Sequence, residues 1–262
     1  MSRLKQPTSR HGPRSAALAC LAALMIGLLP TAQAADLTVS AASSLTNAFN
    51  EIGKEYTKLN PDIRVLFNFG ASGMLVQQLA RGAPVDVLAT ADLESMDRAE
   101  SQRLIVQSSR ANFAANKLVV VTPEDSRLQI DTLGDLTKPD VQRIAIGTPE
   151  TVPVGRYAKE VLEKAGLWTE LSPKFIFTQN VRQSLNYVFR GEVNAGFVYA
   201  SDVTASPVKV RTALQLATER PILYPVAATK GFGNERRALD FIAFVRSPQG
   251  QAILTKYGFL TP

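Results

Sequence analysis

The chain has 262 residues, with 29 Lys and Arg against 23 Asp and Glu, and it contains one Cys and one His. Cys20 and His11 both precede residue 35, so the rest of the chain has no disulfide, thiol nucleophile, Ser-His-Asp triad, or metal site built on imidazole or thiolate. Four basic residues and no acids also precede residue 35; the remaining 25 basic residues (29 less 4) nearly balance the 23 acids and give no reason to expect a nucleic acid partner.

The first segment, residues 1–34, has the pattern of a secretory signal peptide. Basic residues precede an apolar run from Ala16 to Leu29, and an Ala-Gln-Ala tripeptide ends at Ala34. The apolar run is shorter than the roughly 20 residues that cross a bilayer. We therefore predict export to the periplasm and cleavage after Ala34.

From residue 35 onward, short β-rich runs alternate with helical patterns. The predicted strands are 37–41, 63–69, 85–89, 118–121, 143–146, 174–177, 195–199 and 222–227. Apolar residues at helical spacing predict helices over 45–59, 157–165 and 185–189, and Gly166 and Gly191 are expected to end the last two. The alternation predicts an α/β protein with mainly parallel sheets.

Two apolar extended runs, Asn116–Asp125 and Ile222–Gly231, lie symmetrically about the middle of the chain. We interpret them as paired crossings between two lobes, the first lobe being built from both ends of the chain. The predicted domains are a signal peptide at 1–34, lobe 1 at 35–116 plus 223–262, and lobe 2 at 117–222.

Four strand-to-helix junctions share the absence of acids. They are Ser40–Phe49, Asn68–Ala80, Glu150–Glu160 and Thr178–Val188. None has Asp or Glu in its first helical turn, although the helix dipole favours an acid there. Free N–H groups at a helix start bind anions, and ligands of α/β sheets bind beyond the carboxyl ends of the strands. The junctions therefore predict an anion site where these helix starts meet.

The third junction also lacks a side chain that could cap its helix. The helix begins at Val152-Pro153-Val154-Gly155, where Ser, Thr, Asp or Asn is usual. Because Pro153 has no N–H, we expect the next N–H groups, at Val154 and Gly155, to bind the anion.

At these residues the chain resembles the periplasmic molybdate-binding proteins of ABC-type importers. The matching segments include "AASSLTNAFNEI", "FGASGMLVQQLARGAPVDVLATAD", "GTPETVPVGRYAKEVLEKAG", "NVRQSLNYV" and "GFVYASD", in order along residues 35–262. The resemblance implies a type II periplasmic-binding fold, with two α/β lobes joined by two crossing strands and the ligand in the cleft between them. It also implies a monomer that binds molybdate or tungstate without a cofactor and delivers it to the membrane permease of an ABC importer.

The resemblance further implies five ligand contacts. Ser44 and Ser72 would donate from their hydroxyl groups, Val154 and Val181 from their backbone N–H groups, and Tyr199 from its phenol. The same residues would bind the metal only as its oxyanion. These roles are expectations carried by the family motifs.

Two alternative functions stay open. A site made only of donors also suits another fully ionised oxyanion such as sulfate. A secreted Ser-Lys hydrolase is the enzyme alternative; its one candidate pair is Ser206 and Lys209 in "SPVK", which lacks the companion motifs of that class, so we do not expect an enzyme. The acidic run at 92–100 is interpreted as a solvated helix face and not as a metal site.

Overall fold

The computed structural model describes residues 2, 34–206, 208–231 and 233–262. Residues Ala35–Pro262 form one compact unit. The predicted signal peptide lies outside the described residues, apart from Ser2 and Ala34, and stays a prediction. Within the described ranges, no helix has both the length and the apolar character needed to cross a membrane.

The first sheet combines segments from both ends of the unit. Its strands are β1 (Ala35–Ala42), β2 (Ile63–Gly70), β3 (Val87–Ala89), β4 (Ala111–Asn116) and β10 (Ile222–Ala228), in the order β2-β1-β3-β10-β4. Strand β1 is parallel to β2 and β3, whereas β10 is antiparallel to β3 and β4. The helices of this part are α2 (Thr46–Leu59), α3 (Ser72–Ala80), α4 (Leu93–Ser101), α9 (Glu235–Arg246) and α10 (Pro248–Lys256).

The second sheet uses the middle of the chain. Its strands are β5 (Leu118–Pro123), β6 (Ile144–Gly147), β7 (Phe175–Thr178), β8 (Ala195–Tyr199) and β9 (Val210–Leu216), in the order β7-β6-β8-β5-β9. Strand β6 is parallel to β7 and β8, and β5 is antiparallel to β8 and β9. The helices of this part are α5 (Pro153–Lys164), α6 (Trp168–Leu171), α7 (Val181–Phe189) and α8 (Ala200–Ala205).

The chain passes between the two sheets twice. Strand β4 leads through Lys117 into β5, and β9 leads through residues 217–221 into β10. The predicted α/β class is confirmed, but each sheet is mixed, because the strands next to a crossing run against their neighbours. The lobe boundaries near residues 116 and 222 remain our interpretation of these crossings.

All eight predicted strands form, and two further strands were missed. Strand β4 reads ANFAAN, in which Ala and Asn have low β propensity. Strand β9 reads VRTALQL, and most of its side chains are partly or fully exposed, so it lacks a clear apolar run. Both strands are held by pairing with a neighbour, which local sequence does not encode.

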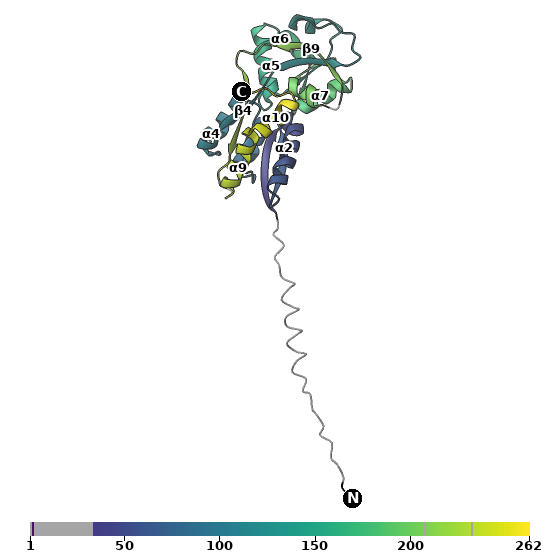
Figure 1. Cartoon of the computed structure of the whole chain (residues 1–262). Coiled ribbons are helices and arrows are strands. Elements are labelled where there is room, and N and C mark those ends of the chain that lie inside the picture. Colours follow the sequence, from purple (N-terminus) through teal and green to yellow (C-terminus); the bar gives the residue numbers. More distant parts are fainter. Residues whose placement is uncertain (1, 3–33, 207, 232) are drawn as a thin grey trace. The chain divides into compact units, whose positions relative to one another are not determined.

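Apolar side chains fix the helices to the sheets. Helix α2 buries the face that its spacing predicts, including Phe49, Ile52 and Tyr56. The ring of Phe49 lies 5.7 Å from that of Phe113 and 6.3 Å from that of Phe241, so α2, β4 and α9 share one core. Figure 1 accordingly shows α2, α9 and α10 together, and α5, α6, α7 and β9 in the other half of the unit.

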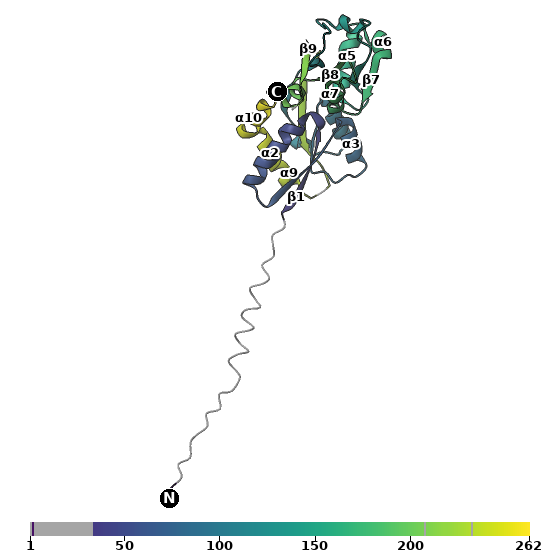
Figure 2. The ribbon, with the colours of Figure 1, turned by 90° about the vertical axis from the view of Figure 1, so that its right-hand side faces the viewer.

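The helices that follow the parallel strands begin in the region between the two sheets. Strands β1 and β2 lead toward α2 and α3, while β6 and β7 lead toward α5 and α7. Figure 2 shows α2 and α3 on opposite sides of β1. Helices α5 and α7 end as predicted, because Gly166 (φ +70°) and Gly191 (φ +66°) adopt the left-handed conformation that glycine favours.

Candidate functional site

The four helix starts surround one small cavity between the sheets. It is lined by Ala42, Ser43, Ser44, Gly70, Ala71, Ser72, Ala91, Val152, Pro153, Val154, Val181 and Tyr199. All five residues that the sequence singled out are among them, although up to 155 positions separate them in the chain (199 less 44). The described lining contains no Asp, Glu, Lys or Arg, so its polar groups are hydroxyl and backbone groups.

The helix starts at this cavity have no acid and little side-chain capping. The short 3-10 turn Ser43–Leu45 before α2, and helices α3 and α5, have no side-chain cap, and none of the four helices has an acid in its first turn. Helix α7 differs, because Asn180 accepts the N–H of Gln183. That cap serves the third residue of the helix and does not involve the N–H of Val181.

At the start of helix α5, one of the two N–H groups that we expected to bind the anion already has a partner in the protein. The Gly155 N–H donates to the Val152 carbonyl at 3.0 Å, so the expectation that it would bind the anion is wrong. Pro153 at the first helical position allows this tight turn. The Val154 N–H has no protein acceptor in the described part of the chain, and the same holds for Val181.

Of the three serines that line the cavity, Ser44 and Ser72 have buried hydroxyls that are hydrogen-bonded to the protein. The Ser72 oxygen accepts the Ala91 N–H at 3.0 Å. The Ser44 oxygen lies 3.0 Å from the phenol oxygen of Tyr224, a residue that the sequence analysis read only as part of a crossing strand. Asn116 in turn donates to the Tyr224 oxygen at 3.2 Å.

The phenol of Tyr199 is the most unusual polar group of the cavity. The side chain is buried, and its oxygen has no hydrogen-bond partner among the described residues. Burial, reinforced by the neighbouring Tyr224, raises the pKa of this phenol well above its ordinary value, so it stays protonated and is a donor. A buried unpaired hydroxyl is costly, and such a group in a native fold calls for a partner of another kind.

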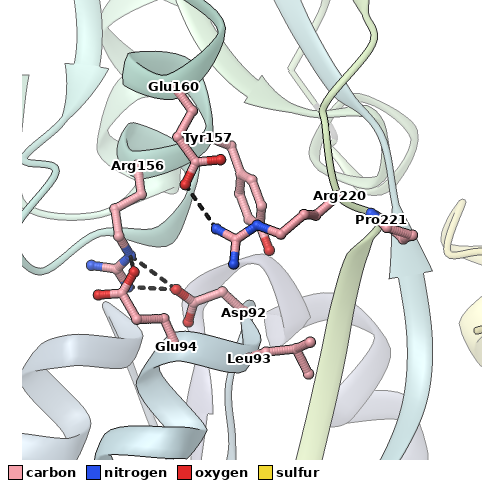
Figure 3. A pocket seen from close by; sticks show the side chains of 8 residues that line it. All are labelled: Asp92, Leu93, Glu94, Arg156, Tyr157, Glu160, Arg220 and Pro221. Atoms are coloured by element: carbon pink, nitrogen blue, oxygen red, sulfur yellow. Dashed lines mark hydrogen bonds and ion pairs between the residues drawn. The ribbon is translucent and has the colours of Figure 1, made fainter.

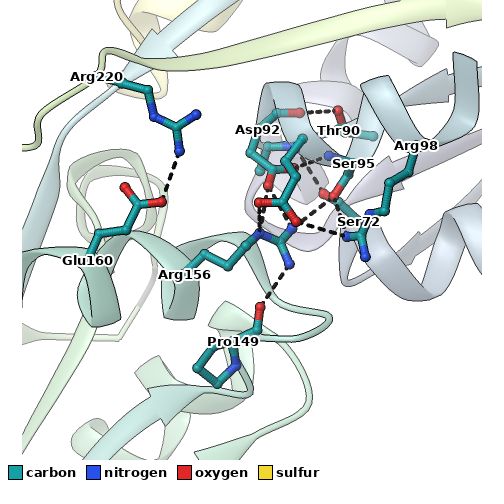
Figure 4. A network of polar contacts seen from close by, with 11 residues as sticks. Ser72, Thr90, Asp92, Ser95, Arg98, Pro149, Arg156, Glu160 and Arg220 are labelled. Carbon is teal, nitrogen blue, oxygen red and sulfur yellow. Dashed lines mark hydrogen bonds and ion pairs between the residues drawn. The ribbon is translucent and has the colours of Figure 1, made fainter. Parts of the chain in front are cut away.

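An ion pair joins the two parts of the unit beside the cavity. The Arg156 guanidinium at the start of α5 donates to Asp92, directly before α4, at 2.6 and 2.9 Å (Figure 3). It also donates to the Ser95 hydroxyl at 2.9 Å and to the Pro149 carbonyl at 2.8 Å (Figure 4). Asp92 is 3% exposed, so the interpretation of this acidic run as wholly solvated is wrong at its first residue.

Two more contacts cross between the sheets around the cavity. The Gly73 N–H at the start of α3 donates to the Thr151 carbonyl at 3.0 Å. Arg182 of α7 donates to the Ser44 carbonyl at 3.2 Å, and its Nε lies 3.0 Å from the buried Asp202 carboxylate. Arg156 and Arg182, each in the first turn of its helix, therefore both point to protein partners.

The alternative sites of the sequence analysis find no geometric support in the described residues. The Ser206 hydroxyl accepts the Val208 N–H, while the Lys209 ammonium is exposed and 3.9 Å from Glu124, so no Ser-Lys pair forms. In the acidic run, Asp97 and Glu100 both pair with Arg110. No group of three or more His, Cys, Asp or Glu in the described ranges is arranged to hold a metal ion.

Comparison with known proteins gives one consistent result. Residues 37–260 match the family model described as bacterial extracellular solute-binding protein. The chain is 37% identical over 228 residues to the molybdate-binding protein ModA of Escherichia coli K12, covering 85% of this chain and 88% of that one. It is 32% identical over 238 residues to ModA of Haemophilus influenzae, covering 87% and 91%.

A solved structure supports the same architecture. The fold matches the periplasmic molybdate-binding protein of Azotobacter vinelandii with a TM-score of 0.78 and 24% identity, covering 86% of this chain and 99% of that one. At this identity the match bears on the fold alone. The relatives and the structure named above are all named as molybdate-binding proteins.

Proposed function

The chain belongs to the family of bacterial extracellular solute-binding proteins, and on this premise we propose that it captures molybdate, with tungstate as the closest analogue, for an ABC importer. Proteins named for molybdate binding match it over more than four fifths of its length. The proposal includes location in the periplasm, a monomeric state, delivery to a membrane permease, and no enzymatic activity.

The observation that carries the proposal is the composition of the cavity. Its polar groups are hydroxyl and backbone groups, among them the N–H groups of Val154 and Val181, and its described lining has no carboxylate. A fully ionised tetrahedral oxyanion only accepts hydrogen bonds, so every one of its oxygens can be satisfied there. Hydrogenphosphate keeps one O–H, which would be left without an acceptor at a cost of about 1–3 kcal/mol.

The charge of the ligand is balanced without a contacting Lys or Arg. Each helix start carries about half a positive charge, so four of them supply about two charges, which matches a dianion. The Val154 and Val181 N–H groups have no protein acceptor in the described residues and lie at two of these starts. We assign Ser44, Ser72, Val154, Val181 and Tyr199 as the ligand contacts.

Capture would proceed by closure of the two parts of the unit over the anion. The donors Ser44 and Ser72 belong to the part that holds the first sheet, and Val154, Val181 and Tyr199 to the part that holds the second. An anion held by both sets of donors favours the closed arrangement by its differential affinity for it. The closed form is the one that we expect to dock on the permease.

The test is calorimetric titration of the purified protein with molybdate, tungstate, sulfate and phosphate in parallel. We expect one site, with molybdate and tungstate bound at least about tenfold more tightly than sulfate, a difference of about 1.4 kcal/mol. Absence of binding by molybdate and tungstate would contradict the proposal. Tighter binding of sulfate would favour a sulfate-binding protein.

A further inference from the structure

The hydroxyl oxygens of Ser44 and Ser72 already interact with the protein, and the direction of these hydrogen bonds matters. The Ser72 oxygen accepts the Ala91 N–H, which is a donor by its nature. A hydroxyl has one proton to donate, and it rotates to suit its partners. Because the Ser72 oxygen accepts on this side, its proton is left to point elsewhere, and the cavity lies there.

For Ser44 the direction of the hydrogen bond is set by Asn116 in the first crossing, which is linked to Ser44 through Tyr224. The Asn116 side-chain oxygen accepts the N–H groups of Lys117 at 2.9 Å and Ser201 at 3.3 Å. These two backbone donors fix which end of the amide is oxygen. The amide nitrogen therefore faces the Ser201 hydroxyl at 2.7 Å and the Tyr224 oxygen at 3.2 Å, and it can only donate to them.

The proton of Tyr224 then has one acceptor within reach. Its oxygen accepts from Asn116, and the other partner that the structure gives it is the Ser44 oxygen at 3.0 Å. Burial keeps this phenol protonated by raising its pKa well above the ordinary value. Tyr224 donates to Ser44, and the Ser44 proton is left for the cavity.

We propose that Asn116 and Tyr224 are positioning residues, which occupy one acceptor position of the Ser44 hydroxyl, favour donation of its proton into the cavity and so make the cavity discriminate against oxyanions that carry a proton. The inference rests on the proposed oxyanion function. An isolated serine hydroxyl can turn to accept the O–H of hydrogenphosphate. Ser44 already accepts the Tyr224 proton, so only one of its two acceptor positions is left, and using that position would turn its own proton away from the anion.

The experiment compares Tyr224→Phe with the wild-type protein by calorimetry at mildly alkaline pH, where inorganic phosphate is mainly hydrogenphosphate. Molybdate is titrated alone and in competition with phosphate, and the readout is the ratio of the two affinities. We expect molybdate affinity to fall about fivefold to tenfold, consistent with about 1 kcal/mol for one lost hydrogen bond. The molybdate-to-phosphate ratio should fall by at least about tenfold.

Tyr56→Phe is the matched control. It also removes the hydroxyl of a buried tyrosine, whose oxygen has no partner among the described residues, and it lies on α2 in the aromatic core. The molybdate-to-phosphate affinity ratio of Tyr56→Phe should equal that of the wild-type protein. Asn116→Asp is a second test, because a carboxylate accepts the Tyr224 proton and reverses the chain of hydrogen bonds; we expect it to lose molybdate affinity by more than Tyr224→Phe does.

The outcomes separate the two proposals. If the wild-type protein binds molybdate and Tyr224→Phe keeps the wild-type ratio, the positioning role is wrong and the oxyanion function stands. If Tyr224→Phe does not fold, a wild-type affinity in Asn116→Asp overturns the positioning role on its own. If the wild-type protein binds no molybdate, the failure is that of the proposed function.

Discussion

The Arg156 guanidinium and the Asp92 carboxylate lie 2.6 Å apart, one at the start of a helix on the second sheet and the other directly before a helix on the first. Their side chains are 12% and 4% exposed, so the pair is largely removed from water. Pairing neutralises a buried carboxylate that directly follows Ala91, a residue lining the cavity proposed to hold an anion. The same contact ties together the two parts of the unit that we expect to separate when the ligand leaves.

Arg156→Met should lower both stability and ligand retention. It leaves the Asp92 charge buried without its partner, and breaking a buried pair in this way costs about 3–5 kcal/mol. We expect a lower melting temperature in a thermal scan and faster molybdate release in stopped-flow measurements.

The control for this prediction is Lys159→Met on the same helix. Its ion pair with Glu163 is exposed at both ends, and such pairs contribute at most about 1 kcal/mol. Adding Asp92→Asn to Arg156→Met should restore part of the lost stability, because Asn still accepts the Ser95 N–H that caps α4. Equal stability of the Arg156 and Lys159 variants would show that the buried pair contributes nothing.

Tyr199→Phe should change stability and affinity in opposite directions. In the ligand-free protein it removes a buried hydroxyl that has no partner in the described residues, so the free energy of unfolding should rise by about 1 kcal/mol. Molybdate should bind about fivefold to tenfold more weakly, because a donor to the anion is lost. Chemical denaturation and calorimetry measure the two effects; a variant that binds molybdate as tightly as the wild type removes Tyr199 from the site.

Ser72→Ala should weaken molybdate binding by about tenfold while the protein stays folded. The substitution removes the hydroxyl donor and leaves the Ala91 N–H without its acceptor. Ser109→Ala is the matched control, since Ser109 is also a buried serine that accepts an alanine N–H, that of Ala228, at 2.9 Å. Both variants should lose stability, Ser109→Ala more because it also loses the hydrogen bond that Ser109 donates to the Val106 carbonyl, and only Ser72→Ala should lose affinity in calorimetry. Equal affinities for the two would place the site elsewhere.

Asp202 should give the stability a distinct pH dependence. Burial raises the pKa of this carboxyl from 3.8 to about 6, against the opposing effects of Arg182 and the Tyr199 N–H. Because the folded-state pKa is the higher one, the folded protein binds the proton more tightly, and stability from this group falls as pH rises from about 4 to about 6.

The measurement is the difference in unfolding free energy between wild type and Asp202→Asn across this range. Asn keeps an acceptor for the Tyr199 N–H, and other carboxylates, such as Asp135 with its lowered pKa, cancel in the difference. We expect the difference to fall between about pH 4 and about pH 6 and to be flat above about pH 7. A difference that rises with pH would mean that Arg182 outweighs burial.

Much of the site was predictable because its signal is local. The absence of acids from four helix starts and the Pro153 start of α5 are read directly from neighbouring residues, and the family motifs indicated which donors meet. The structure brings all five of these residues to one cavity; their role as ligand contacts remains a prediction.

The missed features depend on residues far apart in sequence. Tyr224 and Ser44 are 180 positions apart, and Arg156 and Asp92 are 64 positions apart, so neither contact has a local pattern. Strand β4, with its Ala and Asn residues, forms because β10 pairs with it. The bond of Gly155 to Val152 is a matter of turn geometry, which composition does not specify.

The most direct test of the central claim is the position of the metal in a crystal of the protein grown with molybdate. An anomalous difference map from data collected at the molybdenum absorption edge gives that position without any molybdate having been placed beforehand. We predict one peak in the cavity, roughly 4 Å from the donor atoms of Ser44, Ser72 and Tyr199 and from the N–H groups of Val154 and Val181, since an oxo group and a hydrogen bond lie between. A peak elsewhere, or none at saturating molybdate, would contradict the account.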